Sequence, residues 1–289
     1  MSEDFDVHVG SRRVSVRRRG SPSGRPILYF HGTPESRLTV DCFPIDLLSE
    51  VDIQLIAFDR PGYGNSRFAE FSFESIAADA VAILDHLSCD RVALLGHSGG
   101  GPFALATAAY YPERISCLGV SSGPGDYSLV PGGWASLTPA DRLAASEVRL
   151  DRSRAAELFT PDFVEMRREL LGDEGHAFLS AGLPNDRVVI GDSAFASNFL
   201  DSILEGLREG VEGCAWDNVA WVANWSFHPS EINVPVRLFY GSLDNVIPIS
   251  HGLWLQQEMP NAQLTRWDDL GHLGMFHHLK DVLEEITSS

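Results

Sequence analysis

The segment from Arg91 to Ala104 constrains the fold more than any other part of the chain. Its first half, Val92 to Leu95, is an apolar run typical of a buried strand, and the alanine-rich run from Phe103 to Tyr110 is typical of a helix. Between them lies Gly96-His97-Ser98-Gly99-Gly100, which places a serine at a sharp turn. Glycines on both sides let strand and helix approach closely, and the first helical amides, led by that of Gly99, would face an anion beside the serine. The turn therefore predicts a serine hydroxyl presented to a base.

Expected strands alternate with expected helices on both sides of this turn, which indicates an α/β fold with a mostly parallel, eight-stranded sheet. Residues 5–9 and 13–18 alternate polar and apolar side chains around a Gly-Ser turn and predict an N-terminal hairpin. Further strands are expected at residues 26–30, 53–58, 92–95, 115–120, 234–240 and 263–267. Helices are expected from residue 35 or 36 to beyond residue 48, from residue 72 to 87, at 103–110, at 252–259 and at 276–286.

Residues 123–230 follow a different pattern, in which strand-like runs are scarce. Helix patterns dominate there, with a start at Thr138-Pro139-Ala140-Asp141 and further helices expected at 152–159, 161–171 and 193–207. The strand pattern returns beyond residue 230. We therefore interpret residues 123–230 as a helical cap inserted into one α/β core, whose N-terminal part is residues 1–122 and whose C-terminal part is residues 231–289.

The net charge of the chain restricts the classes of partner that it can bind. A formal net charge of −18 argues against nucleic acid or an anionic membrane as the main partner. The partner that we expect is a small-molecule substrate. The arginines between residues 12 and 19 alternate with Val14 and Val16, which is typical of a solvated hairpin. The N-terminal residues Met1 to Asp4 include no apolar stretch of a signal peptide. The cysteines Cys42, Cys89, Cys117 and Cys214 are too widely spaced for a metal-ligand pair, so we expect reduced thiols in a cytoplasmic protein.

Four segments in order carry a resemblance to a known family: His31-Gly32-Thr33-Pro34, residues 59–66, the glycine-flanked Ser98, and Gly241-Ser242-Leu243-Asp244 with Gly271-His272. On these segments the chain resembles the α/β-hydrolase superfamily, and the resemblance covers both flanks of the insertion. It implies that Ser98 lies on a nucleophile elbow, and that the chain needs no cofactor and no metal. It also implies that residues 59–66, with their Arg-Pro-Gly turn, are structural.

The family's order of nucleophile, acid and histidine is satisfied by Ser98, Asp244 and His272. In that arrangement the histidine takes the serine proton, and the carboxylate fixes the histidine tautomer and stabilises the imidazolium. Asp126, which follows the strand after the elbow, remains an alternative acid.

An acyl oxyanion needs at least two N–H donors aimed at one point. Gly99 supplies one by its position, and the resemblance assigns the other to the backbone of Thr33. Other histidines are expected outside the reaction: His277 and His278 as surface or packing residues, and His31 as a structural hydrogen-bonding residue.

The insertion contains many large apolar side chains, most of which we expect to hold its helices together, with a minority contacting an apolar substrate group. They are Phe159, Phe163, Met166, Phe178, Phe195, Phe199, Trp216, Trp221, Trp225 and Phe227.

The sequence thus predicts a serine hydrolase that cleaves a small apolar carboxylic ester through an acyl-enzyme. Serine at position 98 argues against epoxide hydrolases and haloalkane dehalogenases of this fold, which have aspartate there. An aminopeptidase, a lactonase, a carbon–carbon bond hydrolase and a binding protein without turnover remain alternatives. The aminopeptidase is disfavoured because Gly99 replaces the tryptophan usual after the nucleophile in proline iminopeptidases.

Overall fold

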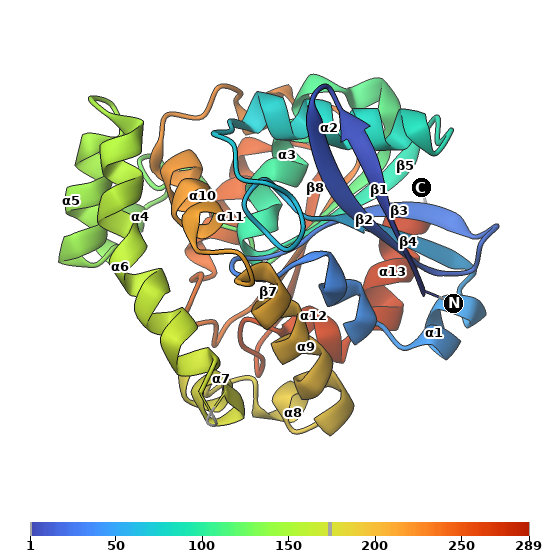
Figure 1. Cartoon of the computed structure of the whole chain (residues 1–289). Coiled ribbons are helices and arrows are strands. Elements are labelled where there is room, and N and C mark those ends of the chain that lie inside the picture. Colours follow the sequence, from blue (N-terminus) through green and yellow to red (C-terminus); the bar gives the residue numbers. More distant parts are fainter. Residues whose placement is uncertain (1, 173–174, 289) are drawn as a thin grey trace.

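In the computed structural model, which describes residues 2–172 and 175–288, an eight-stranded sheet runs through the middle of the molecule (Figure 1). The strands are β1 (Ser2–Val9), β2 (Arg12–Gly20), β3 (Arg25–Phe30), β4 (Ile53–Phe58), β5 (Val92–His97), β6 (Ile115–Ser121), β7 (Val236–Gly241) and β8 (Ala262–Trp267). Their order in the sheet is β1-β2-β4-β3-β5-β6-β7-β8. Pairing is antiparallel from β1 through β2 to β4 and parallel from β4 to β8. The predicted α/β class and the mostly parallel sheet are confirmed.

Helices cover both faces of this sheet. Those outside the insertion are α1 (Ile45–Glu50), α2 (Phe73–His86), α3 (Gly101–Tyr110), α11 (Ser250–Glu258), α12 (Gly274–His277) and α13 (Leu279–Thr287), with the short 3-10 helices η1 (Arg37–Cys42), η2 (Ser98–Gly100), η3 (Pro112–Arg114) and η4 (Pro229–Glu231). Within β3, Leu28 and Phe30 face α2, α3 and α11, while Ile27 and Tyr29 face α13 and the insertion. The strand is therefore buried on both faces, as its continuous apolar sequence predicts.

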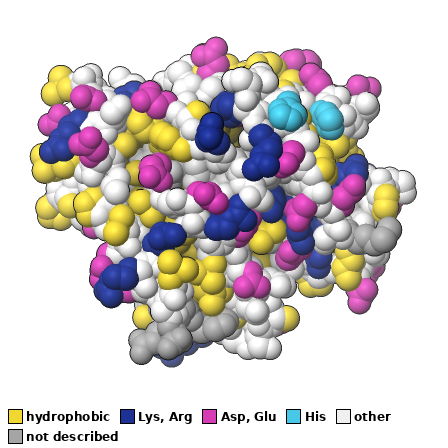
Figure 2. Space-filling model, viewed as in Figure 1, with side chains coloured by type: hydrophobic (Ala, Val, Ile, Leu, Met, Phe, Trp, Pro, Cys, Tyr) yellow, Lys and Arg dark blue, Asp and Glu magenta, His cyan; other side chains and the backbone are white. Residues whose placement is uncertain are grey.

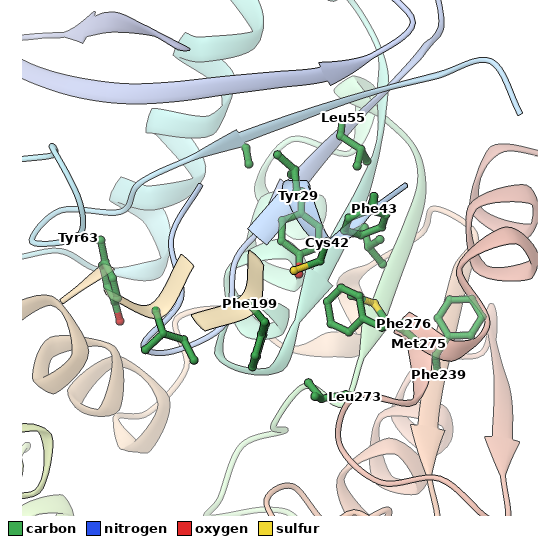
Figure 3. Close-up of a cluster of buried hydrophobic side chains, with 14 of the residues drawn as sticks. Tyr29, Cys42, Phe43, Leu55, Tyr63, Phe199, Phe239, Leu273, Met275 and Phe276 are labelled. Carbon is green, nitrogen blue, oxygen red and sulfur yellow. The ribbon is translucent and has the colours of Figure 1, made fainter. Parts of the chain in front are cut away.

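Between β6 and β7 the described part of the insertion consists of helices and loops, which lie to the left and below the sheet in Figure 1. The helices are α4 (Gly133–Ser136), α5 (Pro139–Glu147), α6 (Arg152–Leu170), α7 (Gly175–Gly182), α8 (Arg187–Ile190), α9 (Ser193–Gly206) and α10 (Glu212–Val222). The insertion shares a hydrophobic cluster with the core, in which Tyr29, Phe43, Phe276 and Phe199 lie close together (Figure 3).

The expected helices differ from those observed in three places. The helix expected after Glu35 is divided into η1 and α1, because Pro44 disfavours helical backbone at the residue before it. Pro161 does not divide α6, which continues from Arg152 to Leu170. The closing helix is divided at His278 into α12 and α13.

The N-terminal hairpin is confirmed, and its arginines are paired with acids. Arg18 contacts Glu3 at 2.5 Å, and Arg17 contacts Asp4 at 2.6 Å across the two strands. Basic and acidic side chains are likewise interspersed over the face in Figure 2 rather than separated into patches. In the described ranges, no helix combines the length and hydropathy that crossing a membrane requires.

Candidate active site

Ser98 follows β5 directly and begins η2, which leads into α3. Its φ is +48°, a left-handed value that costs a non-glycine residue energy and is concentrated at functional sites. This conformation turns the chain sharply between strand and helix. The serine therefore lies where the sequence places it, at the carboxyl edge of the central parallel strands.

His272 brings Ser98 and Asp244 into one chain of contacts. Its Nε2 lies 2.9 Å from Ser98 Oγ, and its Nδ1 lies 2.8 Å from Asp244 Oδ2. The three side chains come from three separate loops, which follow β5, β7 and β8. The structure thus brings together the nucleophile, acid and histidine positions that the sequence pattern selects.

The Asp244 carboxylate is held by more than the histidine. Its Oδ1 accepts the backbone N–H groups of Val246 and Ile247, each at 2.8 Å. Burial disfavours the charged form, but His272 and these two amides outweigh burial and lower the pKa of Asp244. For His272, burial lowers the pKa, whereas Asp244 raises it and prevails. The pair is therefore built to stabilise an imidazolium.

Asp126, the alternative acid, has other partners. Its Oδ1 accepts the backbone N–H of Ser128 at 2.8 Å and the Ser128 hydroxyl at 2.6 Å. This is a local turn of the chain after β6. The geometry therefore favours Asp244 over Asp126.

Gly99 and Thr33 are neighbours across the elbow. A Cβ added at Gly99 would lie 2.6 Å from Thr33 Oγ1 and would overlap the Trp221 ring of α10. Trp221 thus fills the space that a side chain after Ser98 would occupy. A larger residue at position 99 would therefore displace Trp221 or Thr33, and the two predicted oxyanion donors lie on adjacent loops.

A buried ion pair ties the Thr33 loop to the insertion. Arg60, after β4, contacts Asp217 of α10 through Nε at 3.1 Å and Nη2 at 2.6 Å, and both side chains are 0% exposed. Asp217 also accepts hydrogen bonds from the hydroxyls of Tyr63 and Thr33. Arg60 Nη1 donates to the carbonyl oxygen of His31 at 2.6 Å. The segment 59–66 is therefore structural, as expected, because it fixes the loop after β3.

His31 belongs to the same buried network. Its Nδ1 donates to the carbonyl of Gly32 at 2.7 Å, and its Nε2 accepts the backbone N–H of Arg60 at 3.3 Å. Burial and the nearby arginine hold its pKa well below the usual range. This neutral histidine has the structural hydrogen-bonding role that the sequence predicts.

A second buried pair, Glu35 and His97, links three loops of the site. Glu35 Oε1 lies 2.9 Å from His97 Nδ1, and Oε2 accepts the Thr39 hydroxyl at 2.9 Å. On its other side, His97 Nε2 lies 3.4 Å from the carbonyl oxygen of His272. Burial raises the pKa of Glu35, but His97 and the hydrogen bonds outweigh burial and lower it. His97, which directly precedes Ser98, therefore connects the Glu35 loop to the histidine loop.

A pocket of about 210 Å³ opens onto Ser98 and His272. Thr33, Pro34 and Glu35 form one side of it. Helices of the insertion and the loop after β7 supply the apolar residues Met166, Leu170, Leu179, Leu183, Phe199, Ile203 and Val246. Apart from Phe199, these side chains are aliphatic, so most of the pocket wall is aliphatic.

Of the large apolar residues expected in the insertion, Phe199 and Met166 line this pocket. Phe195 stacks on Phe199, and Trp225 and Phe227 pack against Phe73. The side chain of Phe178 lies outside those that the structure describes. His277 is exposed and His278 stacks on Trp267, so neither lies at the site.

Two aspartates beside the site were not selected from the sequence: Asp217, which binds the Thr33 hydroxyl, and Asp186, whose carboxylate accepts the backbone N–H of His272. Asp217 interrupts the apolar stretch from Cys214 to Ala220, and a carboxylate there could have suggested a buried cation partner. Asp186, in contrast, stands in Leu-Pro-Asn-Asp, which is ordinary turn sequence. Its hydrogen bonds to the backbone of His272 and Leu273 join residues far apart in the chain, so the local sequence does not predict them.

Comparison with known proteins bears on the family and the fold of the chain. Residues 25–279 match a family model described as alpha/beta hydrolase fold. A poly(3-hydroxyalkanoate) depolymerase from Ectopseudomonas oleovorans is 27% identical over 275 residues, which cover 91% of this chain and 83% of that protein. A 2-hydroxy-6-oxononadienedioate/2-hydroxy-6-oxononatrienedioate hydrolase from Burkholderia vietnamiensis is 26% identical over 241 residues, covering 81% and 75%.

Solved structures share the fold. A bromoperoxidase from Bacillus anthracis superposes with a TM-score of 0.73 at 18% identity, over 99% of this chain and 100% of that one. An esterase from Exiguobacterium antarcticum gives a TM-score of 0.69 at 19% identity, with the same coverage.

Proposed function

Because the chain belongs to the alpha/beta hydrolase fold family, we propose that it is a serine hydrolase that cleaves carboxylic esters of small apolar acids. The contact of His272 with both Ser98 and Asp244 carries this proposal. Ser98 attacks the ester carbonyl while His272 Nε2 takes the hydroxyl proton, and the alcohol leaves with that proton. Water then attacks the acyl-enzyme, with His272 again as the base, and the acid is released.

Asp244 supports the proton transfer in this scheme. Its carboxylate accepts a hydrogen bond from the Nδ1–H of His272, which leaves the unprotonated Nε2 to accept the serine proton. It then stabilises the imidazolium that forms. The backbone N–H groups of Gly99 and Thr33 are the proposed donors to the oxyanion of the tetrahedral intermediate.

The pocket favours a neutral, aliphatic acyl group. At about 210 Å³ the pocket is small, which favours a short acyl group. Among the described residues that line it there is no lysine or arginine, and both oxygens of Glu35 already accept hydrogen bonds. A free carboxylate on the substrate would therefore be buried without a cation, at a high desolvation cost.

The absence of lysine and arginine among the described residues that line the pocket favours ester hydrolysis over carbon–carbon bond hydrolysis of a dicarboxylate. The relative from Burkholderia vietnamiensis acts on dienedioates, which carry two carboxylates. The depolymerase from Ectopseudomonas oleovorans acts on a polyester of hydroxyalkanoates, whose acyl units are aliphatic. The aliphatic wall of this chain fits the second kind of substrate better. We further propose that residues 123–230 act as the cap that selects this acyl group.

A panel of p-nitrophenyl esters tests the proposal. We expect kcat/KM to be highest for butyrate and hexanoate, and to fall for dodecanoate, which exceeds the pocket. The half-ester p-nitrophenyl succinate is similar in size to the butyrate ester but carries a free carboxylate, so it serves as the size-matched, charged control and should react more slowly. A higher kcat/KM for the succinate half-ester than for the butyrate ester would contradict the preference for a neutral acyl group. Absence of turnover with every ester would contradict ester hydrolysis.

A further inference from the structure

A buried carboxylate of the insertion lies against the backbone that bears His272. Asp186 precedes α8 and is 0% exposed. Its Oδ2 accepts the backbone N–H of His272 at 3.0 Å, and its Oδ1 accepts that of Leu273 at 2.8 Å. One side chain therefore binds two consecutive amides directly beside the imidazole that contacts Ser98.

Gly271 makes room for this carboxylate. A Cβ added there would lie 2.5 Å from Asp186 Oδ2 and 2.8 Å from the carboxyl carbon. On the other side of the segment, the buried side chain of Leu273 lies in the hydrophobic cluster with Phe276 (Figure 3). The segment is thus held between the core and the insertion.

Asp186 and Asp244 contact different parts of His272 and so have different roles. Asp244 contacts the ring and sets its orientation, whereas Asp186 contacts the backbone and sets where the side chain starts. Asp186 is not among the residues that line the pocket, so it acts through His272 and not on the substrate.

We infer that Asp186 is a positioning residue for the proposed hydrolysis, because its carboxylate holds the His272 segment with Nε2 within reach of Ser98 Oγ. This inference rests on the proposed function. Since Asp186 belongs to residues 123–230, the insertion governs whether the histidine is in place as well as which acyl group fits.

The pH profile of the reaction is a readout that a purely structural role of Asp186 would not change, because it depends on the charges around His272. The groups facing it are Asp244 after β7, Asp186 from the insertion, Glu35 after β3, and His97 at the end of β5. Burial lowers the pKa of His272, and the three carboxylates raise it. Replacing Asp186 by a neutral residue therefore moves the acid limb of the pH profile to lower pH.

The test compares Asp186→Asn and Gly271→Ala with the matched control Asp192→Asn. Asp192 is also an aspartate of the insertion that accepts two backbone amides, those of Ala194 and Phe195, but at the start of α9. With p-nitrophenyl butyrate we expect kcat to fall on the order of 100-fold in the first two variants, with little change in KM, because displacing a reacting group by about 1 Å costs this much. Asp192→Asn should retain the wild-type kcat.

The outcomes separate this inference from the proposed function. A folded Asp186→Asn protein with the wild-type kcat overturns the inference. A lower kcat in that variant also overturns it if the acid limb of its pH profile stays where it is in the wild type. Absence of esterase activity in the wild type instead contradicts the proposed function. If Asp186→Asn does not fold, Gly271→Ala carries the test, because it displaces the same carboxylate without removing it, and an unchanged kcat there overturns the inference.

Discussion

The guanidinium of Arg60 and the carboxylate of Asp217 form a fully buried ion pair that joins the loop after β4 to helix α10. Asp217 also binds the Thr33 hydroxyl, so this pair connects the insertion to the proposed oxyanion loop. The two halves of the proposed site, the Thr33 loop and the His272 segment, are thus each bound by one buried aspartate of the insertion.

Asp217→Asn leaves the Arg60 charge buried without its counterion. We expect the free energy of unfolding to fall by about 3–5 kcal/mol, as measured by urea denaturation. Glu157→Gln is the matched control, because Glu157 pairs with Arg154 at 2.6 Å on the exposed face of α6 and such pairs contribute little. Equal effects of the two changes would contradict the assignment of Asp217 as a buried anchor.

Asp244→Asn should lower kcat on p-nitrophenyl butyrate by roughly 10⁴-fold, because the amide no longer selects the reactive tautomer of His272. Asp126→Asn should leave kcat close to that of the wild type, since Asp126 binds only its own turn through Ser128. The reverse ranking would make Asp126 the acid.

The pH dependence follows from the shifted pKa of His272. Asp244 holds this pKa above the usual value of 6.5 despite burial. Because the base must be neutral to accept the serine proton, kcat/KM rises with pH through this raised pKa and is lost as pH falls below it. In Asp244→Asn the acid limb should move to lower pH in the residual activity. A limb that stays in place in that variant would show that another group titrates.

Gly99→Ala tests the packing of the proposed oxyanion site. The added methyl group would meet the Trp221 ring and the Thr33 hydroxyl, so the two loops must separate. We expect kcat to fall on the order of 100-fold, because the donors leave their positions. The double variant Gly99→Ala/Trp221→Ala should recover part of this loss. Full activity of Gly99→Ala would mean that the loops are not as close as the structure places them.

Much of the core could be predicted because its patterns are local. The apolar run of β3, the Ser72 start of α2 and the glycine-flanked Ser98 each specify a conformation within a few residues. The family order of Ser98, Asp244 and His272 then identified side chains that the structure brings together. The resemblance to the α/β-hydrolase superfamily is confirmed by the family match over residues 25–279.

The insertion could not be predicted in the same way, since its role depends on contacts between residues far apart in the chain. Asp186 binds amides 86 and 87 residues away, and Asp217 binds Arg60 across 157 residues. No local pattern distinguishes Asp186 from an aspartate in a solvated turn, and the apolar stretch around Asp217 could suggest a buried cation partner but not which one. Helix α10 was missed for a related reason, because it is apolar around much of its surface and lacks amphipathic spacing.

The most direct test of the central claim is to locate the covalent adduct of a fluorophosphonate. After reaction with the probe, the digested protein is analysed by mass spectrometry. We expect one modified peptide with the phosphonyl group on Ser98, and no labelling of Ser98→Ala or of wild type denatured before the reaction. Labelling that persists in Ser98→Ala, or an ester-hydrolysing protein that the probe does not modify at Ser98, would contradict the proposed role of Ser98.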